Sequence, residues 1–235
     1  MTKTIFQRRR LLALAIMLIT TTIALSQSSS EQWQKYIQDW REFLGYDLGL
    51  AKTETNQNTV ALLESLEVKG RAPKTGYSRE QFSDGWARID GCDMRNRILQ
   101  RDLVDVKIDQ KCNVVSGKLN DQYTGKTINF ERGQATSSAV QIDHIVAVSD
   151  AWQKGAQQLT YEQRHAFYND PDNLIASDGP ANQQKGDSDA ASWLPPNKSF
   201  RCQYVTRQII IKARYQLWVT AAEKEAMVRE LNKCV

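Results

Sequence analysis

The sequence lacks the signatures of several specialised structural classes. Its 235 residues contain no heptad array, no collagen-like period and no internal repeat, which excludes a coiled coil, a collagen-like fibre and a repeat solenoid. No Cys-x-x-Cys pair occurs, so a zinc site is only a weak alternative use for the 4 cysteines. What remains is the composition of an ordinary globular protein, 41% hydrophobic and 25% charged, in a chain long enough for one domain with a sizeable core.

The first 26 residues differ from the rest of the chain. Lys3 and three consecutive arginines form a basic start, residues 11–25 form an apolar run, and Ala24 and Ser26 place small side chains where a signal peptidase reads. An uncleaved membrane anchor is the alternative, but the run is short for a bilayer core of roughly 30 Å. Residues 1–26 are therefore predicted to be a secretory signal peptide that is cleaved near Ser26, which leaves a chain with no membrane contact.

Removing this leader also removes the excess of positive charge. The whole chain has 31 basic and 27 acidic residues, for a formal net charge of +4. The leader holds 4 basic residues and no acidic ones, so the rest of the chain has 27 of each. The pI of 8.8 is therefore no evidence for nucleic-acid binding, and any basic surface must come from local clustering.

The cysteines all lie in the exported part of the chain, at positions 92, 112, 202 and 234. An even number of cysteines in an exported protein indicates disulfides, here two, and four cysteines allow three pairings. We favour Cys92–Cys112 and Cys202–Cys234, because each pair joins neighbouring segments of the chain.

Hydrophobic periodicity divides the exported chain into two parts. Residues 27–68 contain two helical patterns, over 31–44 and 58–66, and carry no recognisable chemistry, so we expect a helical N-terminal appendage. Residues 69–235 form the main domain. There, helices are predicted over 93–103, 150–168, 181–191, 204–215 and 221–231, and strands over 111–119, 127–130, 139–145 and 172–176. Ser78 is expected to begin a capping box and Thr220 to cap the last helix.

Residues 143–185 contain the side chains that phosphodiester hydrolysis requires. Asp143 and His144 stand side by side near the end of an apolar strand, and Asn173 and Asn182 follow. The reaction needs a base for water, a cation that offsets the phosphate charge, and a group that holds the base. Neutral imidazole can accept a proton near neutral pH, and a hard cation such as Mg²⁺ prefers oxygen ligands. The pattern therefore favours a metal-dependent hydrolase over a histidine with only a structural role.

The order Asp-His, Asn, a second Asn nine positions later, and Lys185 three positions beyond it resembles the ββα-metal motif of HNH endonucleases. The wider sequence is similar to the secreted bacterial HNH endonuclease family, which is related to the C-terminal nuclease domain of GmrSD-type restriction enzymes. The resemblance covers residues 62–234. It rests on residues 70–82, 92–103, 123–126, 143–152 and 193–196.

This resemblance implies an α+β fold: a ββα-metal core of the HNH or His-Me finger type, a preceding β-hairpin, surrounding helices and two disulfides. It implies that Asp143 and Asn182 bind a divalent metal ion, Mg²⁺ or alternatively Mn²⁺, and that His144 is the general base. Asn173 would hold the His144 ring, and Asn169 is a nearby alternative for that role.

Other polar residues are candidates for contact with the substrate phosphates. Arg97 and Arg101 lie one helical turn apart, and Arg95 lies on the same segment. Lys185 lies about one turn after the second asparagine and is a further candidate. A solvated helix surface is an equally good interpretation of the arginines. The second histidine, His165, has no acidic or cysteine partner at metal-binding spacing and is interpreted as structural.

We therefore predict a secreted, metal-dependent endonuclease acting on nucleic acid, with DNA of little sequence preference as the favoured substrate. A nuclease toxin delivered to rival cells ranks second, because the sequence shows no delivery module. A third hypothesis, from a different class, is a non-catalytic nucleic-acid-binding protein on a nuclease scaffold. The intact set of Asp143, His144, Asn173 and Asn182 argues against it.

Overall fold

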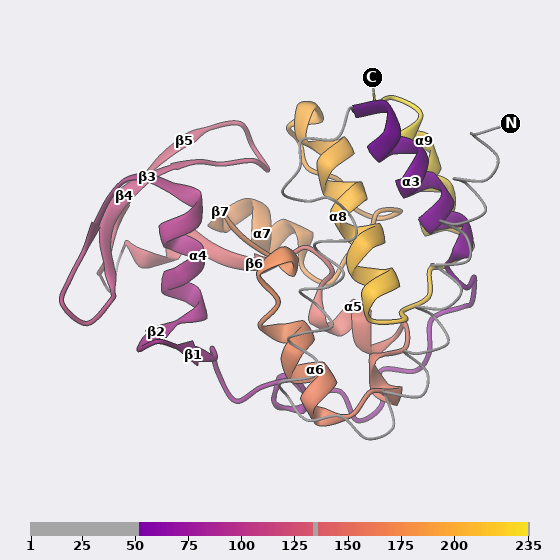
Figure 1. Cartoon of the computed structure of the whole chain (residues 1–235), viewed down its shortest axis with the longest axis horizontal. Coiled ribbons are helices and arrows are strands. Elements are labelled where there is room, and N and C mark those ends of the chain that lie inside the picture. The colour runs from indigo at the N-terminus through magenta and orange to yellow at the C-terminus, as the bar shows by residue number, and fades with distance from the viewer. Residues whose placement is uncertain (1–51, 134–135, 235) are drawn as a thin grey trace, which may run out of the picture. The chain divides into compact units, whose positions relative to one another are not determined.

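The computed structural model describes residues 52–133 and 136–234. The predicted signal peptide and the first helix of the predicted appendage lie outside these residues. Within them, helices accompany three small antiparallel sheets, with strand orders β1-β2, β3-β4-β5 and β6-β7 (Figure 1). The mixed α+β class predicted from the sequence is confirmed. In this part of the chain, no helix combines the length and apolarity needed to cross a membrane.

The longer elements follow one another along the chain. The helices are α3 (Lys52–Ser65), α4 (Met94–Asp102), α5 (Val148–Trp152), α6 (Tyr161–Tyr168), α7 (Gly179–Lys185), α8 (Arg201–Arg214) and α9 (Ala221–Leu231). The strands are β1 (Arg88–Ile89), β2 (Cys92–Asp93), β3 (Leu103–Ile108), β4 (Val114–Asn120), β5 (Thr127–Glu131), β6 (Val140–His144) and β7 (Leu174–Asp178). Short 3-10 helices also occur, among them Arg79–Gln81.

The predicted hairpin is present and has a third strand. β4 and β5 pair antiparallel, with Lys118 opposite Asn129, which confirms the hairpin. β3, which the sequence pattern does not predict, pairs with the other edge of β4, with Leu103 opposite Leu119. The helix predicted to run to residue 103 instead ends at Asp102, because Leu103 adopts an extended backbone and begins β3.

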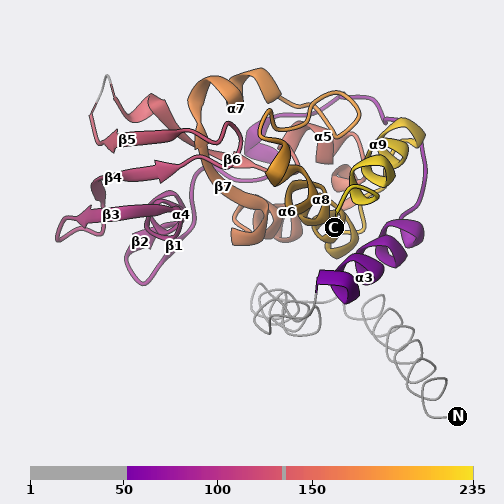
Figure 2. The ribbon, with the colours of Figure 1, turned by 90° about the horizontal axis from the view of Figure 1, so that it is seen from above.

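Helix α4 packs between this sheet and the antiparallel pair β6-β7. We call this pair the β6-β7 hairpin, although a long connection joins its strands. Helix α4 lies against the three-stranded sheet (Figure 2), and it also contacts both strands of the hairpin. Met94, Ile98 and Leu99 line one side of the helix at helical spacing and are buried. They pack in one cluster with Leu119 of the sheet and Leu174 of the hairpin. The position of the hairpin is therefore fixed by a continuous hydrophobic core.

The β6-β7 hairpin is followed directly by α7. His144, at the end of β6, lies opposite Leu174 at the start of β7. Asp178 ends β7 and caps α7 with its side chain. Gly179 begins α7, and a Cβ at this position would collide with the carbonyl oxygen of Ser138, so the close approach requires glycine. α7 contacts both strands, which gives a ββα arrangement.

The connection between β6 and β7 is not the single helix predicted over 150–168. It contains α5 and α6, which are separate helices. Gly155 interrupts the helical path with a φ of 121°, a conformation that favours glycine, and its Cα faces the ring of Trp218. Thr160 then begins α6 with a complete capping box to Gln163. The prediction of one continuous helix is therefore wrong, because the chain turns at Gly155.

A second hydrophobic core lies among α3, α8 and α9. Leu63 of α3 and Leu66 just after it are buried in one cluster with Ile209 of α8 and Met227 of α9. Burial of these leucines joins α3 to the rest of the domain. The described end of residues 27–68 therefore belongs to this core, and residue 69 does not mark a boundary between α3 and its partners.

The two predicted caps have different outcomes. Thr220 accepts a hydrogen bond from the Glu223 amide, and the Glu223 side chain accepts one from the Thr220 amide, so the cap of α9 is confirmed. Ser78 precedes only the short 3-10 helix Arg79–Gln81, and its side chain makes no capping hydrogen bond there. That prediction is wrong, because the chain leaves the helical path after one turn.

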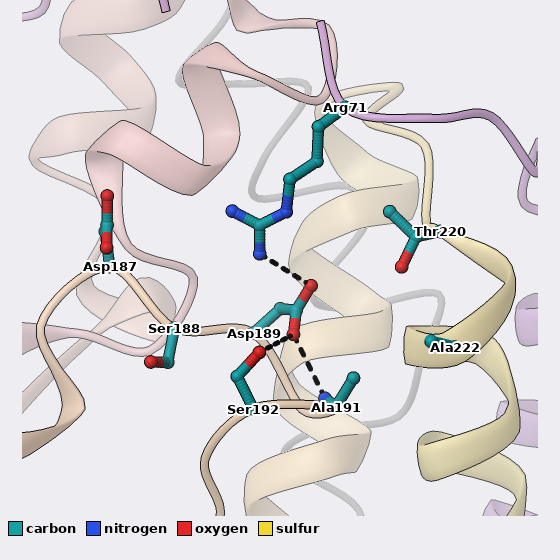
Figure 3. A pocket seen from close by; sticks show the side chains of 8 residues that line it. All are labelled: Arg71, Asp187, Ser188, Asp189, Ala191, Ser192, Thr220 and Ala222. Atoms are coloured by element: carbon teal, nitrogen blue, oxygen red, sulfur yellow. Dashed lines mark hydrogen bonds and ion pairs between the residues drawn. The ribbon is translucent and has the colours of Figure 1, made fainter.

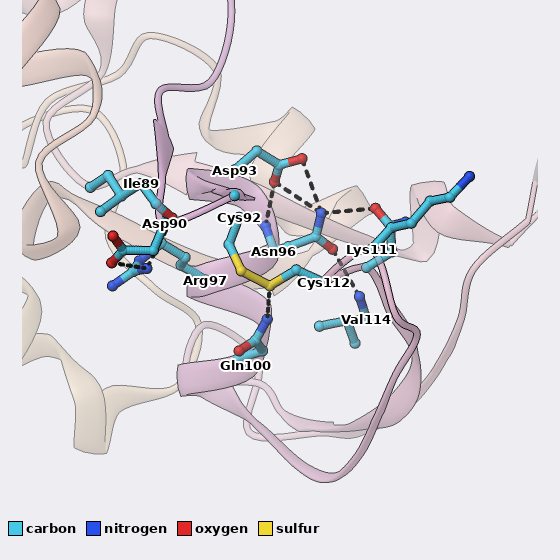
Figure 4. The surroundings of a disulfide bond; sticks show 12 residues. Ile89, Asp90, Cys92, Asp93, Asn96, Arg97, Gln100, Lys111, Cys112 and Val114 are labelled. Carbon is cyan, nitrogen blue, oxygen red and sulfur yellow. Dashed lines mark hydrogen bonds and ion pairs between the residues drawn. A yellow bond between two sulfur atoms is a disulfide. The ribbon is translucent and has the colours of Figure 1, made fainter.

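Both disulfides join the pairs favoured from the sequence. Cys92 of β2 is bonded to Cys112 in the turn before β4, with Gln100 of α4 beside the sulfur atoms (Figure 4). Cys202 in the first turn of α8 is bonded to Cys234 after α9. All four cysteines are described, and none is free. The first disulfide thus fixes the start of α4, and the second ties α8 to the end of α9.

Candidate active site

Asp143 and His144 are the last two residues of β6, and their side chains lie on opposite faces of the hairpin, as alternation along a strand requires. Asp143 contacts Tyr123 and Lys185. His144 contacts Tyr168 and neighbouring aromatic rings. The candidate site is therefore divided between two surroundings, which we call the Asp143 face and the His144 face of β6.

On the Asp143 face, the carboxylate is held by two buried donors. The Tyr123 hydroxyl donates to Oδ2 at 2.5 Å, and the Lys185 ammonium lies 2.9 Å from Oδ2 and 3.1 Å from Oδ1. The same ammonium donates to the His144 carbonyl oxygen at 2.8 Å. Burial, followed by the Asp143 charge, raises the pKa of Tyr123 well above its usual value, so the phenol remains a neutral donor. Two protein donors thus compensate the charge of the carboxylate.

Helix α7 crosses this face with Lys185 at Asp143 and Asn182 about one turn earlier. The Asn182 amide nitrogen donates to the side-chain oxygen of Gln141 at 2.9 Å, and Gln141 precedes Asp143 by two positions on the same face. The structure therefore brings Asn182 and Lys185 to the strand that carries Asp143. The α7 residue that bonds to Asp143 is Lys185, whereas the sequence pattern favours a phosphate contact for that side chain.

On the His144 face, the imidazole is enclosed by aromatic rings. Trp86 and Phe167 lie nearly parallel to it, with ring centroids 5.8 and 6.4 Å away and interplanar angles of 13° and 9°. The ring of Tyr168 is 4.6 Å away, and His144 is only 3% exposed. Burial lowers the pKa of His144 to about 3; nearby positive charges, Arg79 first, act in the same direction, and the hydrogen bond to Tyr168 opposes them. The ring is therefore neutral at physiological pH.

One hydrogen bond determines which nitrogen of this ring holds the proton. Nε2 of His144 lies 2.8 Å from the backbone oxygen of Tyr168. A carbonyl oxygen only accepts hydrogen bonds, so Nε2 must carry the hydrogen and donate it. A neutral imidazole has one ring hydrogen, which leaves the lone pair on Nδ1. His144 thus has Nδ1 as its acceptor, which is the form that a general base requires.

Asn173 holds the chain just beyond His144. Its side chain is fully buried. Its side-chain oxygen accepts from the Val146 amide at 2.8 Å, and its backbone oxygen accepts from the Ile145 amide at 2.7 Å. These hydrogen bonds fix the backbone that leaves β6. They support His144 through the backbone that follows it, whereas the imidazole ring itself is held from α6.

Asn169, the alternative in the sequence, acts on another segment. Its side-chain oxygen accepts from the Ala87 amide at 2.8 Å, and its side-chain nitrogen donates to the backbone oxygen of His165 at 3.1 Å. Ala87 follows Trp86, whose ring stacks on His144. Asn169 therefore anchors the segment whose Trp86 ring covers the His144 imidazole. The side chain of His165 lies 3.4 Å from Asn169.

Comparison with known proteins assigns the chain to a family. The model of the family described as "GmrSD restriction endonucleases, C-terminal domain" matches residues 93–230. The chain belongs to this family. It is also 41% identical over 177 residues, 74% of this chain and 83% of the relative, to a protein of Arthroderma benhamiae named as an uncharacterized secreted protein. That relative is fungal, so the bacterial origin expected from the resemblance is not confirmed. No solved structure matches the chain significantly.

The residues matched by the family contain the whole ββα arrangement. They include Asp143, His144 and the two asparagines of the predicted site, Asn173 and Asn182. Trp86 and Arg79, which lie at the His144 face, precede the match. The His144 face therefore also includes residues on the N-terminal side of the match.

The three arginines predicted to bind phosphate all bond to protein groups. Arg95 donates to the Val140 carbonyl at 3.3 Å, and burial lowers its pKa. Arg97 donates to a backbone carbonyl of β1 at 3.3 Å. Arg101 donates to both oxygens of the Asp102 carboxylate and to two backbone carbonyls near the start of β7. Phosphate binding by these arginines stays a prediction, and Arg101 would have to break several bonds to do it.

Three residues of the site are not identified by the sequence pattern. Tyr123 and Arg79 lie in stretches that carry the family resemblance, and membership of those stretches is the one signal that singles them out. Trp86 carries no such signal. Arg79 donates from Nε to the Tyr168 hydroxyl at 3.2 Å, and its guanidinium carbon lies 5.5 Å from the centre of that ring. Tyr123 and Trp86 contact β6 directly and Arg79 contacts Tyr168 of α6, all through long-range packing that spacing alone does not reveal.

A buried cluster of charges ties the segments that follow β6 and α7 to α8 and α9. The Lys154 ammonium lies 2.7 Å from carboxylate oxygens of Asp150, Asp189 and Glu223. Asp150 lies in α5 soon after β6, Asp189 follows α7, and Glu223 lies in the first turn of α9. Lys212 of α8 pairs with Asp150 and Glu223; burial lowers its pKa, but the two carboxylates outweigh burial and raise it overall. The segments that leave β6 and α7 are thus tied to the second core.

A surface pocket of about 370 Å³ opens beside this cluster (Figure 3). Its lining residues are Arg71, Asp187, Ser188, Asp189, Ala191, Ser192, Thr220 and Ala222. Arg71 donates to Asp189 at 2.9 Å and lies 3.4 Å from Asp150, so its charge is part of the cluster. Neither Asp143 nor His144 lines the pocket. It is therefore separate from the candidate active site.

A divalent cation at the Asp143 face would have few protein ligands. In the described ranges, no group of three histidine, cysteine, aspartate or glutamate side chains is arranged to hold a metal ion. Asp143 offers a carboxylate and Asn182 an amide oxygen, and Mg²⁺ accepts such oxygen donors when water completes its shell. The Lys185 ammonium, 2.9 Å from Oδ2 and 3.1 Å from Oδ1, already neutralises the Asp143 carboxylate. A divalent ion at Asp143 would therefore have to displace the Lys185 ammonium.

Proposed function

We propose that this chain is an exported, metal-dependent endonuclease that hydrolyses phosphodiester bonds in nucleic acid, with DNA of little sequence preference as the favoured substrate. One observation carries the proposal: a neutral imidazole, held through Nε2, has Nδ1 as its acceptor, and the residue before it on the same strand end supplies a carboxylate on the opposite face. Membership in a family of restriction endonuclease domains supports a nucleic-acid substrate.

His144 would accept a proton from the attacking water through Nδ1. A pKa of about 3 makes it a weak base in the free protein, because the best general bases have pKa values near the working pH. An anionic phosphate beside the ring stabilises the imidazolium, so substrate binding raises this pKa toward neutrality. The His144 face thus keeps the base neutral until the substrate charge arrives. Positioned base catalysis is typically worth about 10²- to 10⁴-fold in rate.

Asp143 and Asn182 would hold the divalent ion, Mg²⁺ or Mn²⁺. When bound, the ion offsets charge on the phosphate and on the departing oxygen. Tyr123 orients the carboxylate through its hydroxyl, and Asn173 fixes the backbone beyond the base. Lys185 neutralises the carboxylate in the metal-free protein, and it is free to contact the phosphate once it leaves Asp143.

Export is the second part of the proposal. The basic and apolar pattern of residues 1–26 supports a signal peptide. The two disulfides support an oxidising destination, because disulfides persist outside the cytosol. The relative from Arthroderma benhamiae is named as a secreted protein, which supports the same conclusion for this chain.

The direct test uses the chain from residue 27 onward, prepared with its disulfides formed, and supercoiled plasmid. Wild type should nick the plasmid with Mg²⁺ or Mn²⁺ and should stop when EDTA is added. His144→Ala should lower the rate by about 10²- to 10⁴-fold. His165→Ala replaces the other histidine and is the matched control, which should cleave like wild type. No cleavage by wild type with any divalent ion, or equal cleavage by His144→Ala, would contradict the proposal.

The pair of Asp143 and Lys185 favours a second candidate, a non-catalytic nucleic-acid-binding protein on a nuclease scaffold. A carboxylate paired with a buried ammonium, and a histidine that is 3% exposed, are also expected of a site without metal chemistry. Such a protein would shift DNA in a gel without cleaving it, and EDTA would change nothing. The plasmid assay with a parallel gel shift separates the two candidates.

A further inference from the structure

An exposed arginine beside the His144 face has no acidic partner among the residues that the structure describes. Arg79 lies in the 3-10 helix Arg79–Gln81, and its Nε donates to the Tyr168 hydroxyl at 3.2 Å. Its two terminal nitrogens form no hydrogen bond or ion pair within that part of the chain. The guanidinium is therefore oriented by a tyrosine, while its charge stays uncompensated.

The same tyrosine holds the proposed base. The backbone oxygen of Tyr168 accepts the hydrogen of His144 Nε2 at 2.8 Å, and the two rings are 4.6 Å apart. Arg79 bonds to the hydroxyl at the tip of the Tyr168 side chain and stacks over its ring at 5.5 Å. A phosphate that approaches the His144 face therefore meets a cation that Tyr168 already positions. The two terminal nitrogens of this cation have no bond to a described residue that must break first.

The arginines of α4 differ from Arg79 in this respect. Arg101 is bonded to both oxygens of Asp102, and Arg95 is bonded to the carbonyl of Val140. A phosphate would have to compete with these bonds. A planar guanidinium with two free nitrogens instead matches two oxygens of a phosphodiester directly, and its orientation by Tyr168 reduces the entropy lost on binding.

We propose that Arg79 binds the phosphate that is hydrolysed at the His144 face, through its two terminal nitrogens. This inference rests on the proposed function, and it places a phosphate contact outside residues 93–230, which match the family. Arg79 would then supply the charge that the sequence pattern assigns to the arginines of α4. Removing one donor that stabilises charge in the transition state typically lowers the rate by about 10²- to 10³-fold.

Rates of plasmid cleavage test this role. Arg79→Met should cleave about 100-fold more slowly than wild type, and Arg79→Lys, which keeps the charge without the fork, should recover part of the loss. Arg88→Met is the matched control, because Arg88 is a nearby exposed arginine that donates to the Gly91 carbonyl. It should cleave like wild type. An Arg79→Met rate equal to that of Arg88→Met, with both proteins folded, would overturn the inference.

A binding measurement keeps the inference testable if wild type proves inactive, which by itself would refute only the nuclease function. Fluorescence anisotropy with a short labelled DNA duplex in EDTA reports phosphate contacts without cleavage. Arg79→Met should then bind about tenfold more weakly than wild type, and the slope of log affinity against log salt should fall by about one. Arg88→Met should change neither quantity. In an inactive protein, equal binding by wild type and Arg79→Met would overturn the inference.

Discussion

The two faces of β6 treat neighbouring ionisable residues in opposite ways. On the Asp143 face, the carboxylate meets a hydroxyl and an ammonium, so fixed donors compensate its charge. On the His144 face, aromatic rings exclude water and compensate no charge, so the imidazole stays neutral with a pKa of about 3. One strand end therefore carries a compensated carboxylate and an uncharged imidazole, and alternation along the strand keeps them on opposite faces.

The register of β6 is therefore part of the chemistry of the site. A slip by one residue would move His144 next to the ammonium and Asp143 among the aromatic rings. A carboxylate buried without partners is costly, so the slipped arrangement is strongly disfavoured. Asn173 and the charge cluster around Lys154 oppose such a slip, because they tie down the segments that leave β6 and α7.

Removing the carboxylate from the Asp143 face should have the largest effect. Asp143→Ala leaves Lys185 buried without its carboxylate, so the free energy of unfolding should fall by about 3–5 kcal/mol. Urea unfolding in EDTA measures this loss. The double variant Asp143→Ala/Lys185→Met removes both charges and should recover most of it. A double variant no more stable than Asp143→Ala would show that an unpaired ammonium is not the cause.

The His144 face can be tested through pH. Its pKa is about 3 in the folded protein and has the ordinary value of 6.5 in the unfolded chain. Between these values the unfolded chain binds a proton that the folded protein does not, so stability falls as the pH is lowered from 6.5 toward 3. This histidine alone contributes about 1.4 kcal/mol per pH unit within that window. His144→Phe keeps an aromatic ring but binds no proton, so its unfolding free energy should fall less steeply.

Chemical unfolding at several pH values between 6.5 and 4 compares the two proteins. The difference between their slopes isolates the contribution of this one ring, because all other titrating groups are shared. Parallel pH dependences in wild type and His144→Phe would mean that the imidazole is not held neutral by its surroundings.

Opening the His144 face should have a smaller effect. Trp86→Ala removes one of the two rings that lie parallel to the imidazole and lets water reach it, so the pKa of His144 should rise toward its ordinary value. NMR titration of the ring protons measures the change. The chain has only 2 histidines, so a His165→Gln sample assigns both signals. An unchanged titration of His144 in Trp86→Ala would show that Trp86 does not desolvate the base.

Elements with a local signal are predictable from the sequence. α9 has helical periodicity and the Thr220 cap, and the β4-β5 hairpin has two β-like segments around a turn. β3 is different, because only Leu103 in it is buried and the strand is defined by pairing with β4. The partners of α3, which are α8 and α9, lie at the far end of the chain. No local pattern reveals that Leu63 packs against them.

The candidate site divides in the same way. Asp143, His144 and the two asparagines lie in one short stretch, so their spacing carries the family pattern. The hydrogen bond that sets the imidazole tautomer is accepted by the backbone oxygen of Tyr168. A pattern of side chains cannot reveal a backbone acceptor. The pairing of Lys185 with Asp143 depends on how α7 lies across β6, and only the folded chain shows it.

A crystal structure of the protein soaked with Mn²⁺, whose anomalous scattering locates the ion, tests the central claim most directly. We predict Mn²⁺ bound to the Asp143 carboxylate and the Asn182 amide oxygen, with the Lys185 ammonium displaced and His144 still bonded through Nε2 to the Tyr168 oxygen. An intact pair of Asp143 and Lys185, with no ion beside it at a Mn²⁺ concentration that supports cleavage, would contradict the account.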